Sequence, residues 1–293
     1  MRMTIHLIPT DDAGWWLPLF EPAMERWSRR RLEQLGMPTK DVERALRVIA
    51  KELDDGPITR TEARERVKEA GIELRSQADP LRSQTGQHIV GLAVLSGLAV
   101  LGPDRGAQSM LIRREDWLGK LPRFDREKAL AELARRYIGA FGPATDRDFA
   151  YWSGLPVRDV RAGLGAIAHE LDEGRVGEET MLVLRGAVPR LPAEGQVRML
   201  GNFDTYLLGW KDRAFAVSNE HAAHVKEGGG GWIRPVIVRD GVVVGGWRSS
   251  RKEGRLEISL NLDSAMRKEL APAIEDEVAD LARFEGIEVT VST

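Results

Sequence analysis

Cysteine is absent from the 293 residues of the chain. Its absence excludes disulfide bonds, thiolate metal ligands and a cysteine nucleophile. Long apolar runs are lacking as well, so no segment is expected to span a membrane as a helix. Residues 1–9 are too few and too polar for a secretory signal peptide. We therefore expect a cytoplasmic protein with no membrane partner.

An excess of charge of one sign is also missing, since 43 lysines and arginines are balanced by 45 aspartates and glutamates. The net charge of −2 excludes a protein that coats nucleic acid through a uniformly basic surface. A binding face for a polyanion therefore depends on local clusters of cations. Three such clusters are Arg26, Arg29, Arg30 and Arg31, then Arg105, Arg113 and Arg114, and finally Arg248, Arg251, Lys252 and Arg255. Each is alternatively an ordinary solvated run on the surface.

Aromatic residues make up only 6% of the chain, yet eight of them are tryptophan. Most of these tryptophans are expected to anchor the core, because each buries a large apolar surface. One or two exposed indole rings would suit a second role, stacking on an unpaired base.

An internal repeat is the most informative feature that is present. The segment from Gly56 to Ala63 is echoed by the segment from Gly142 to Phe149. In each copy a Gly-Pro pair ends one helix, and a threonine, Thr59 or Thr145, stands at the expected N-cap of the next. An acidic residue follows each threonine three positions later. The pattern predicts a capping box in the first copy and an aspartate version of it in the second.

Each copy of the repeat is followed by two further predicted elements of helix and then a β-hairpin. After the first copy, these elements are expected at 60–70, 85–97 and 98–112. After the second copy, they are expected at 146–153, 156–171 and 172–184. Helix, helix, helix and hairpin, twice over, is the order of the winged helix, a helix-turn-helix variant that also occurs in protein-interaction modules.

In winged-helix proteins the third helix usually reads the major groove of DNA, and the hairpin forms the wing. We therefore take the residues at the start of the predicted helix 85–97, and the arginine at the tip of its hairpin, as candidates for DNA contact. These residues are Gln84, Thr85, Gln87, His88 and Arg105.

The two ends of the chain differ from the repeat. Residues 4–8 alternate between polar and apolar and predict a short strand, which a helix reaching about Leu35 follows. The last third predicts strands around the turn at 239–241 and over 255–260, then a helix over 264–284 and a strand over 287–291. Arg248, Arg251, Lys252 and Arg255 crowd a turn within this β-rich part and complete the set of candidate DNA contacts.

The fold class predicted from these patterns is α+β, with tandem winged-helix modules followed by a small C-terminal β-barrel or curved sheet with a covering helix. The expected divisions are an N-terminal strand and helix that are a remnant of a first winged-helix module, two complete winged helices, and a β-rich domain. Their boundaries are 1–38, 39–121, 122–190 and 191–293.

Other motifs offer little chemistry. His221 and His224 lie one helical turn apart, but no third metal ligand is apparent by spacing, so a surface helix is the favoured interpretation and no metal is expected. The glycine run 228–231 lacks the Gly-Lys-Ser/Thr of a phosphate-binding loop and is interpreted as a flexible linker. No serine stands in a Gly-x-Ser-x-Gly elbow.

Four segments resemble those of a known family. They begin with Arg-Met-Thr-Ile-His-Leu-Ile-Pro at the N-terminus and include Phe-Asp-Thr-Tyr-Leu-Leu-Gly-Trp-Lys-Asp-Arg further on. Together they occupy residues 2–9, 141–155, 203–213 and 234–248. The chain resembles the AlkZ-like DNA glycosylases from about residue 2 to residue 285.

This resemblance implies tandem winged helices and a C-terminal β-barrel around a concave channel that holds double-stranded DNA. It also implies monofunctional excision of alkylated purines, in some members from interstrand crosslinks, with no metal or organic cofactor. An N7-alkylated guanine is already cationic and leaves readily. Such an enzyme therefore needs a positioned water and stabilisation of the sugar cation more than it needs acid catalysis.

The sequence departs from the family at the catalytic motif, which the resemblance implies to be a glutamine, an apolar residue and then glutamine or aspartate. That motif lies upstream of the segment matched by Arg2 to Pro9, so no catalytic residue is assigned to this chain. Gln77-Ala78-Asp79 fits the pattern at a different position and is interpreted as coincidence. We expect a monomer that binds DNA, and a non-enzymatic DNA-binding or transcription-regulatory protein on the same scaffold is the alternative.

Overall fold

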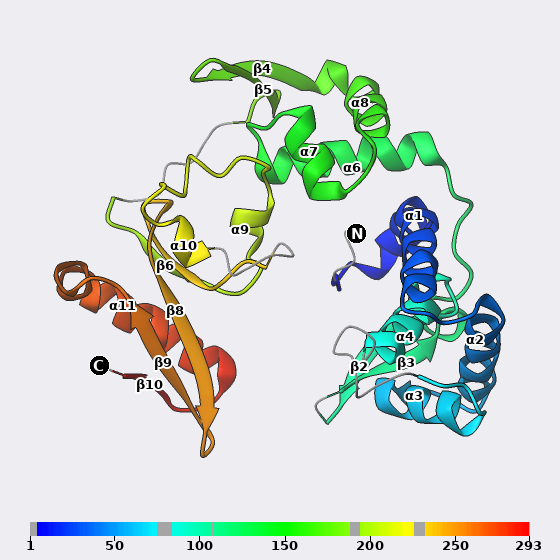
Figure 1. Cartoon of the computed structure of the whole chain (residues 1–293). Coiled ribbons are helices and arrows are strands. Elements are labelled where there is room, and N and C mark those ends of the chain that lie inside the picture. The colour runs from blue at the N-terminus through cyan, green and yellow to red at the C-terminus, as the bar shows by residue number, and fades with distance from the viewer. Residues whose placement is uncertain (1–4, 75–83, 107, 188–193, 226–231, 293) are drawn as a thin grey trace. The chain divides into compact units, whose positions relative to one another are not determined.

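A computed structural model describes residues 5–74, 84–106, 108–187, 194–225 and 232–292 (Figure 1). The chain forms two compact units, each composed of two segments of the sequence. Unit 1 comprises residues 1–134 and 153–166, and unit 2 comprises residues 135–152 and 167–293. Both helices and sheets occur, as the predicted α+β class requires. No helix in the described part of the chain is long and apolar enough to cross a membrane.

Unit 1 is mainly helical, with one small sheet. Its helices are α1 (Ala13–Gln34), α2 (Thr39–Asp54), α3 (Arg60–Glu69), α4 (Thr85–Leu95), α5 (Arg114–Leu118), the first part of α6 (Arg126–Phe141) and α8 (Val157–Ala166), and a 3-10 turn (Thr10–Asp12) precedes α1. Its strands are β1 (Ile58–Thr59), β2 (Ala99–Arg105) and β3 (Gln108–Arg113). The strands are ordered β1-β3-β2, and all of them pair antiparallel.

The core of unit 1 follows from helical periodicity. On α2, Val42, Ile49 and Leu53 recur on one face, and all three are buried. They pack in one cluster with the apolar face of α4, represented by Ile89, and with Leu111 of β3. The sheet and helices α2, α3 and α4 therefore share a single hydrophobic core, which holds the hairpin β2–β3 against the helices (Figure 1).

Of two predictions near the N-terminus, one is confirmed and the other is wrong. The helix predicted to end near Leu35 is confirmed as α1, and Gly36 follows it with a φ of 81° while Met37 donates a backbone hydrogen bond to the Leu32 carbonyl. The strand predicted over residues 4–8 is wrong for the described part of that segment, because residues 5–9 carry no strand. Ile5 and Leu7 are exposed there, so the alternation does not bury an apolar face as it would in a strand of a sheet.

Unit 2 combines the remainder of α6 with short helices and most of the sheet structure. Its helices are α7 (Asp146–Ser153), of which Ser153 falls in unit 1, α9 (Thr205–Leu208), α10 (Ala222–Val225) and α11 (Ser264–Glu285), together with a 3-10 turn (Ala168–Glu170). Its strands are β4 (Leu171–Val176), β5 (Glu179–Leu184), β6 (Val197–Leu200), β7 (Val236–Arg239), β8 (Val242–Lys252), β9 (Arg255–Asn261) and β10 (Val289–Ser292).

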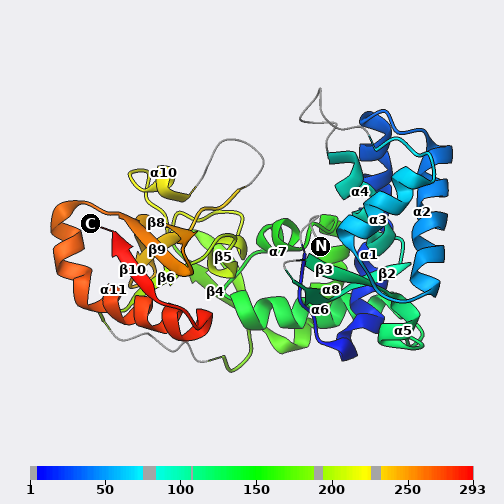
Figure 2. The same ribbon diagram turned by 90° about the horizontal axis from the view of Figure 1, so that it is seen from below.

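The C-terminal sheet has five strands in the order β10-β9-β8-β7-β6. Only β10 runs parallel to its neighbour, and the other pairs are antiparallel. Helix α11 covers one face, where Leu270 and Ile274 pack with Ile237 of β7 and Trp247 of β8 (Figure 2). The prediction of a sheet with a covering helix is confirmed. A closed barrel is not formed by the described residues, because β10 and β6 are the two open edges of the sheet.

Both capping boxes that the repeat predicts are present. In the first, the Thr59 backbone donates to the Glu62 carboxylate at 2.6 Å, and the Glu62 backbone donates to the Thr59 hydroxyl at 3.1 Å. In the second, the Thr145 backbone donates to Asp148 at 3.0 Å, and the Asp148 backbone donates to the Thr145 hydroxyl at 3.1 Å. Each box therefore satisfies N–H groups at the start of a helix, α3 or α7.

The repeat extends to the strand pairing beside each box. Ile58, directly before the first threonine, pairs with Leu111 of the hairpin β2–β3. Ala144, directly before the second threonine, forms an antiparallel bridge with Leu182 of the hairpin β4–β5. The residue before each N-cap thus contacts the return strand of the following hairpin, which short-range sequence patterns did not predict.

Candidate functional site

The residues predicted to read DNA from the start of α4 differ in exposure. Gln87 is exposed, while Gln84 and His88 are half-buried. Thr85 is only 2% exposed, so its side chain is not open to a ligand in this structure. Helical periodicity explains the difference in exposure, because Thr85 and Ile89 lie one turn apart on the face of α4 that packs into the core of unit 1. Gln84, Gln87 and His88 remain candidates.

His88 lies beside an exposed tryptophan of α1. The centroids of the His88 and Trp27 rings are 5.9 Å apart, and Trp27 is 46% exposed. Partial burial, and then the nearby charge of Arg31, lower the pKa of His88. The imidazole is therefore neutral at neutral pH, and together with the indole it forms a small aromatic surface beside Gln87.

Arg105 stands at the tip of the hairpin β2–β3, as expected, and forms an ion pair with Glu62 of the first capping box. Gln108, on the other strand of the hairpin, accepts hydrogen bonds from the Thr61 hydroxyl at 2.6 Å and the Thr61 backbone at 3.3 Å. The hairpin is thus tied to the start of α3. A nucleic acid that engaged Arg105 would have to compete with the Glu62 carboxylate for it.

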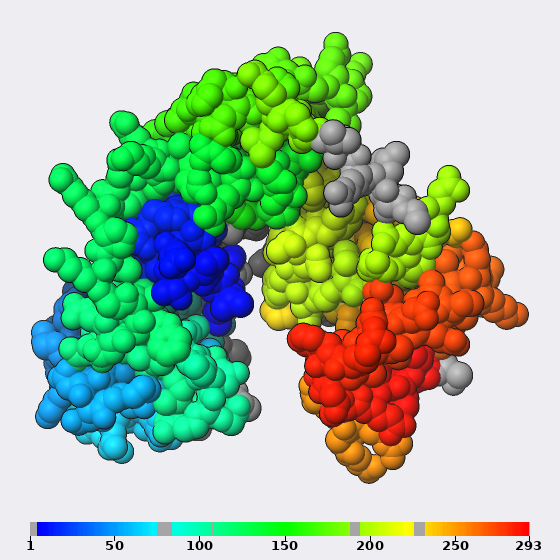
Figure 3. All heavy atoms as spheres, turned by 180° about the vertical axis from the view of Figure 1, so that it is seen from behind, coloured from blue at the N-terminus to red at the C-terminus, as the bar shows by residue number. Residues whose placement is uncertain are grey.

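The hairpin β8–β9 carries the third cationic cluster of the sequence. Its tip extends past α11 (Figures 1 and 3). Three cations near the tip each have an acidic partner: Arg251 pairs with Glu285, Lys252 with Glu257 at 2.7 Å, and Arg255 with Glu288 at 3.7 Å. The cationic side chains nevertheless remain 54–65% exposed. These surface pairs are weak, so a stronger anion would displace the carboxylates at little cost.

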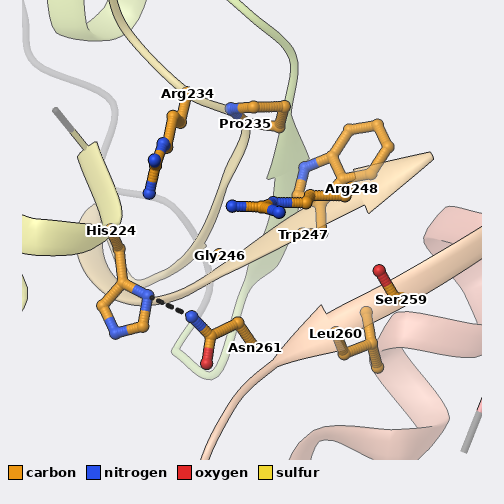
Figure 4. A pocket seen from close by; sticks show the side chains of 9 residues that line it. All are labelled: His224, Arg234, Pro235, Gly246, Trp247, Arg248, Ser259, Leu260 and Asn261. Atoms are coloured by element: carbon orange, nitrogen blue, oxygen red, sulfur yellow. Dashed lines mark hydrogen bonds between the residues drawn. The ribbon is translucent and has the colours of Figure 1, made fainter. Parts of the chain in front are cut away.

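Arg248 differs from the other cations of this hairpin. It is exposed, and no carboxylate lies within ion-pair distance of it among the residues that the structure describes. It lines a cavity of about 400 Å³ together with residues of α10, of the segment directly before β7, and of β9 (Figure 4). Sequence reasoning placed Arg248 with the cations of the turn, but the structure separates it from them and gives it a different setting.

His221 and His224 lie close together, but the described residues around them supply no further metal ligands. The His221 and His224 rings have centroids 5.6 Å apart, and His224 shares a contact of 3.3 Å between its Nδ1 and the Asn261 amide nitrogen. Within the described ranges, no group of three or more histidine, aspartate or glutamate side chains is placed to hold a metal ion. Gln77-Ala78-Asp79 and the glycine run 228–231 lie outside the described residues.

The profile of the DNA glycosylase AlkZ-like family matches residues 1–284. The chain belongs to this family. A search of characterised proteins finds the interstrand DNA cross-link repair glycosylase of Streptomyces sahachiroi, 32% identical over 304 residues, which cover 98% of this chain and 78% of that protein.

The structure is similar to that of a solved AlkZ-like protein. The Streptomyces sahachiroi DNA glycosylase AlkZ matches with a TM-score of 0.66 and 26% sequence identity. The match covers 100% of this chain and 80% of that protein. It supports the mixed arrangement of helices and sheets along the whole chain.

Three of the segments that carry the AlkZ-like resemblance meet inside unit 2. The Tyr206 hydroxyl donates to the Gly241 carbonyl at 2.7 Å, and the Trp210 indole donates to the Pro143 carbonyl at 3.4 Å. Asp148 accepts from the Lys211 backbone at 2.9 Å in addition to capping α7. These contacts are structural, so much of what makes the sequence recognisable holds the unit together.

Sequence reasoning missed Tyr137 as a centre of this packing. Its ring stacks on Phe149 with centroids 4.6 Å apart, and its hydroxyl donates to the Gly209 carbonyl at 2.8 Å. Burial, and then the nearby charge of Asp148, raise the pKa of Tyr137, so the phenol stays protonated. The apolar periodicity of α6 could have indicated that Tyr137 is buried, but it does not identify Phe149 and Gly209 as its partners.

Proposed function

We propose that this chain binds double-stranded DNA and acts on alkylated purines, including bases held in interstrand crosslinks. The observation that carries the proposal is the match of residues 1–284 to the AlkZ-like family. The cross-link repair activity named for the Streptomyces sahachiroi relative supplies the substrate class. No metal or organic cofactor enters this proposal.

Two winged helices are the proposed DNA-binding elements. The order α2, β1, α3, α4 and the hairpin β2–β3, with β1 against β3, supports a winged helix at 39–121. The order α6, α7, α8 and the hairpin β4–β5 supports a second at 122–190. In the first, α4 would enter the major groove, and Gln84, Gln87 and His88 would contact base edges or phosphates there.

The hairpin tip of β8–β9 is the second proposed contact. Arg251, Lys252 and Arg255 are exposed and hold carboxylates only through surface ion pairs. On contact with DNA, the phosphates would replace these carboxylates and release condensed counterions. Such contacts position the protein without reading sequence, which suits an enzyme that must find a lesion in any sequence.

Excision is proposed as a step separable from binding. An N7-alkylated purine carries a positive charge, so its bond to the sugar breaks readily once the cation-like sugar and the attacking water are held in place. The resemblance assigns no catalytic residue to any position of this chain, whereas the proposed binding residues are all within it. Binding and base release therefore have to be measured independently.

The binding test is fluorescence anisotropy on a labelled duplex at several salt concentrations. We expect an affinity that falls steeply as salt rises, with little preference among undamaged sequences. Failure of the chain to bind any duplex at low salt would overturn the proposal.

The excision test is a single-turnover assay on the same duplex carrying one 7-methylguanine, with an undamaged duplex as control. Release of 7-methylguanine would support the glycosylase function and make Gln77 and Asp79 the first residues to replace. Tight binding without release would favour the non-enzymatic alternative, a DNA-binding or regulatory protein on the same scaffold.

A further inference from the structure

A cavity of about 400 Å³ opens on the C-terminal sheet (Figure 4). It draws residues from α10, from the segment directly before β7, and from β8 and β9. The charged and polar side chains in its lining are His224, Arg234, Arg248, Ser259 and Asn261. No acidic residue is among the described residues that line it.

Strand alternation explains why these groups converge. In the β8–β9 ladder Arg248 pairs with Ser259, and Gly246 pairs with Asn261, so their side chains share one face of the sheet. The intervening Trp247 packs on the opposite face, in the cluster that α11 covers. The cavity is therefore on the face of the sheet that α11 leaves open.

Backbone contacts hold the segments that carry Arg234 and His224 over this face. The Arg234 backbone donates to the Val225 carbonyl at 2.9 Å, which ties the start of β7 to the end of α10. The Trp247 backbone donates to the Pro235 carbonyl at 3.3 Å. The side chains of Arg234 and Arg248 consequently extend into the same opening, with His224 and Asn261 below them (Figure 4).

Gly246 lies beside His224 in the lining of the cavity. A Cβ atom built at Gly246 would lie 3.4 Å from Nδ1 of His224 and 3.6 Å from the Pro235 carbonyl oxygen. Any longer side chain there would occupy the space between the strand and the imidazole. A side chain larger than that of alanine at position 246 would therefore fill part of the cavity.

The chemistry of this lining is that of an oxyanion site. Two guanidinium groups offer forked N–H donors that match the oxygens of a phosphate, and an amide, a hydroxyl and an imidazole add further donors. The cations at the hairpin tip each have a carboxylate partner, whereas Arg248 has none within the described residues. Positive groups gathered without acids around one cavity favour an anionic ligand.

We propose that this cavity binds a phosphate oxyanion, and that its source is a phosphodiester of the DNA backbone. The volume of about 400 Å³ lies in the range of roughly 300–1,000 Å³ found for small-molecule sites. A lone inorganic ion would leave much of that space unfilled, whereas a phosphodiester brings its flanking sugars. The choice of DNA as the source rests on the proposed function.

The first experiment compares the salt dependence of duplex binding by the wild type, Arg248→Gln and Arg283→Gln. Arg283 is an exposed arginine of α11, the helix on the other face of the sheet, so its substitution matches the change in charge. We expect Arg248→Gln to reduce the magnitude of the negative slope of log K against log salt by about 0.9, the value for one lost phosphate contact. We expect Arg283→Gln to leave the slope unchanged. An unaltered slope in Arg248→Gln would overturn the proposal.

A second arm separates the two sources of phosphate. Inorganic phosphate is titrated into each protein at constant ionic strength, and the Nε–Hε signals of the arginine side chains are followed by NMR. Shifts in the wild type that disappear in Arg248→Gln support an oxyanion site. The same shifts combined with an unchanged DNA slope would overturn the assignment to the DNA backbone, in favour of a free phosphate.

The two arms also distinguish this inference from the proposed function. Loss of all duplex binding by the wild type would refute the proposed function, and the NMR titration would then decide the oxyanion site alone. Absence of any phosphate-dependent shift, with or without DNA binding, would refute an oxyanion site at this cavity. Circular dichroism of Arg248→Gln controls for folding, and the exposed position of Arg248 predicts a native spectrum.

Discussion

Replacing Asp148 with alanine is expected to destabilise unit 2 far more than its place in a repeated motif suggests. Asp148 is only 6% exposed. One carboxylate oxygen accepts from the Thr145 backbone and hydroxyl, at 3.0 and 2.6 Å. The other accepts from the Lys211 backbone at 2.9 Å, which joins α7 to a loop 63 residues away. Alanine removes all three hydrogen bonds at once.

The magnitude follows from two losses. Loss of the Asp148 carboxylate removes the bonds from the Thr145 backbone and hydroxyl, and a typical hydrogen bond of this kind contributes roughly 0.5–1.5 kcal/mol. The backbone N–H of Lys211 is left without its acceptor, and an unsatisfied donor in a part-buried site adds about 1–3 kcal/mol. Asp148→Ala should therefore lower the free energy of unfolding by about 3 kcal/mol. In a protein of this size that corresponds to a drop in Tm of roughly 6–12 °C.

The matched control is Thr59→Ala, which removes the N-cap side chain of the first box. Its expected cost is about 1 kcal/mol, because only local hydrogen bonds are lost. Urea unfolding followed by circular dichroism measures both variants against the wild type. Equal losses in the two variants would show that the contact between Asp148 and Lys211 contributes nothing, and the reasoning from tertiary contacts would be wrong.

Three further predictions concern binding, pH and packing. The triple variant Arg251→Ala, Lys252→Ala and Arg255→Ala should weaken duplex binding equally on every sequence. It should also reduce the magnitude of the negative slope of log K against log salt by up to about 2.7. Binding equal to that of the wild type would show that this hairpin tip is not part of the DNA interface. Burial lowers the pKa of His88 in the folded protein, so at pH values below the ordinary histidine pKa the unfolded chain binds more protons than the folded one. The free energy of unfolding should therefore fall as the pH drops from 6.5. The urea midpoint of His88→Gln should fall less than that of the wild type between pH 6.5 and 5.5, and an equally steep fall would contradict the prediction. Gly163→Ala should destabilise unit 1 by about 1–3 kcal/mol, because its Cβ would lie 2.5 Å from the Leu130 carbonyl oxygen; an unchanged urea midpoint would show that α6 and α8 adjust freely.

Much of the local structure was predictable because it depends on short-range chemistry. The two capping boxes need only a threonine and an acid three residues apart, and both are present. The apolar spacing of α2 predicted its buried face correctly through Val42, Ile49 and Leu53. The alternation over residues 4–8 was the misleading case, since residues 5–9 form no strand in the described structure.

The candidate contacts show where local prediction ends. Thr85 belongs to the predicted start of α4, but its direction around the helix places it in the core at 2% exposure. Arg248 belongs to a run of cations in the sequence, yet strand alternation and the approach of Arg234 and His224 set it in a cavity of its own. Exposure and neighbours depend on packing between distant segments, which the order of residues along a strand or helix does not contain.

By itself, the sequence determined the family, the repeat and most helix and strand positions, because these depend on residue identity at fixed short spacings. The tertiary structure alone decided which of these residues act together. It made Asp148 a link to Lys211, opened the five-stranded sheet instead of closing it, and brought Arg234, His224 and Arg248 to one face. The physical reason is that hydrogen bonds, strand edges and clustered charges are properties of groups close in space, and closeness between segments is set by how the whole core packs.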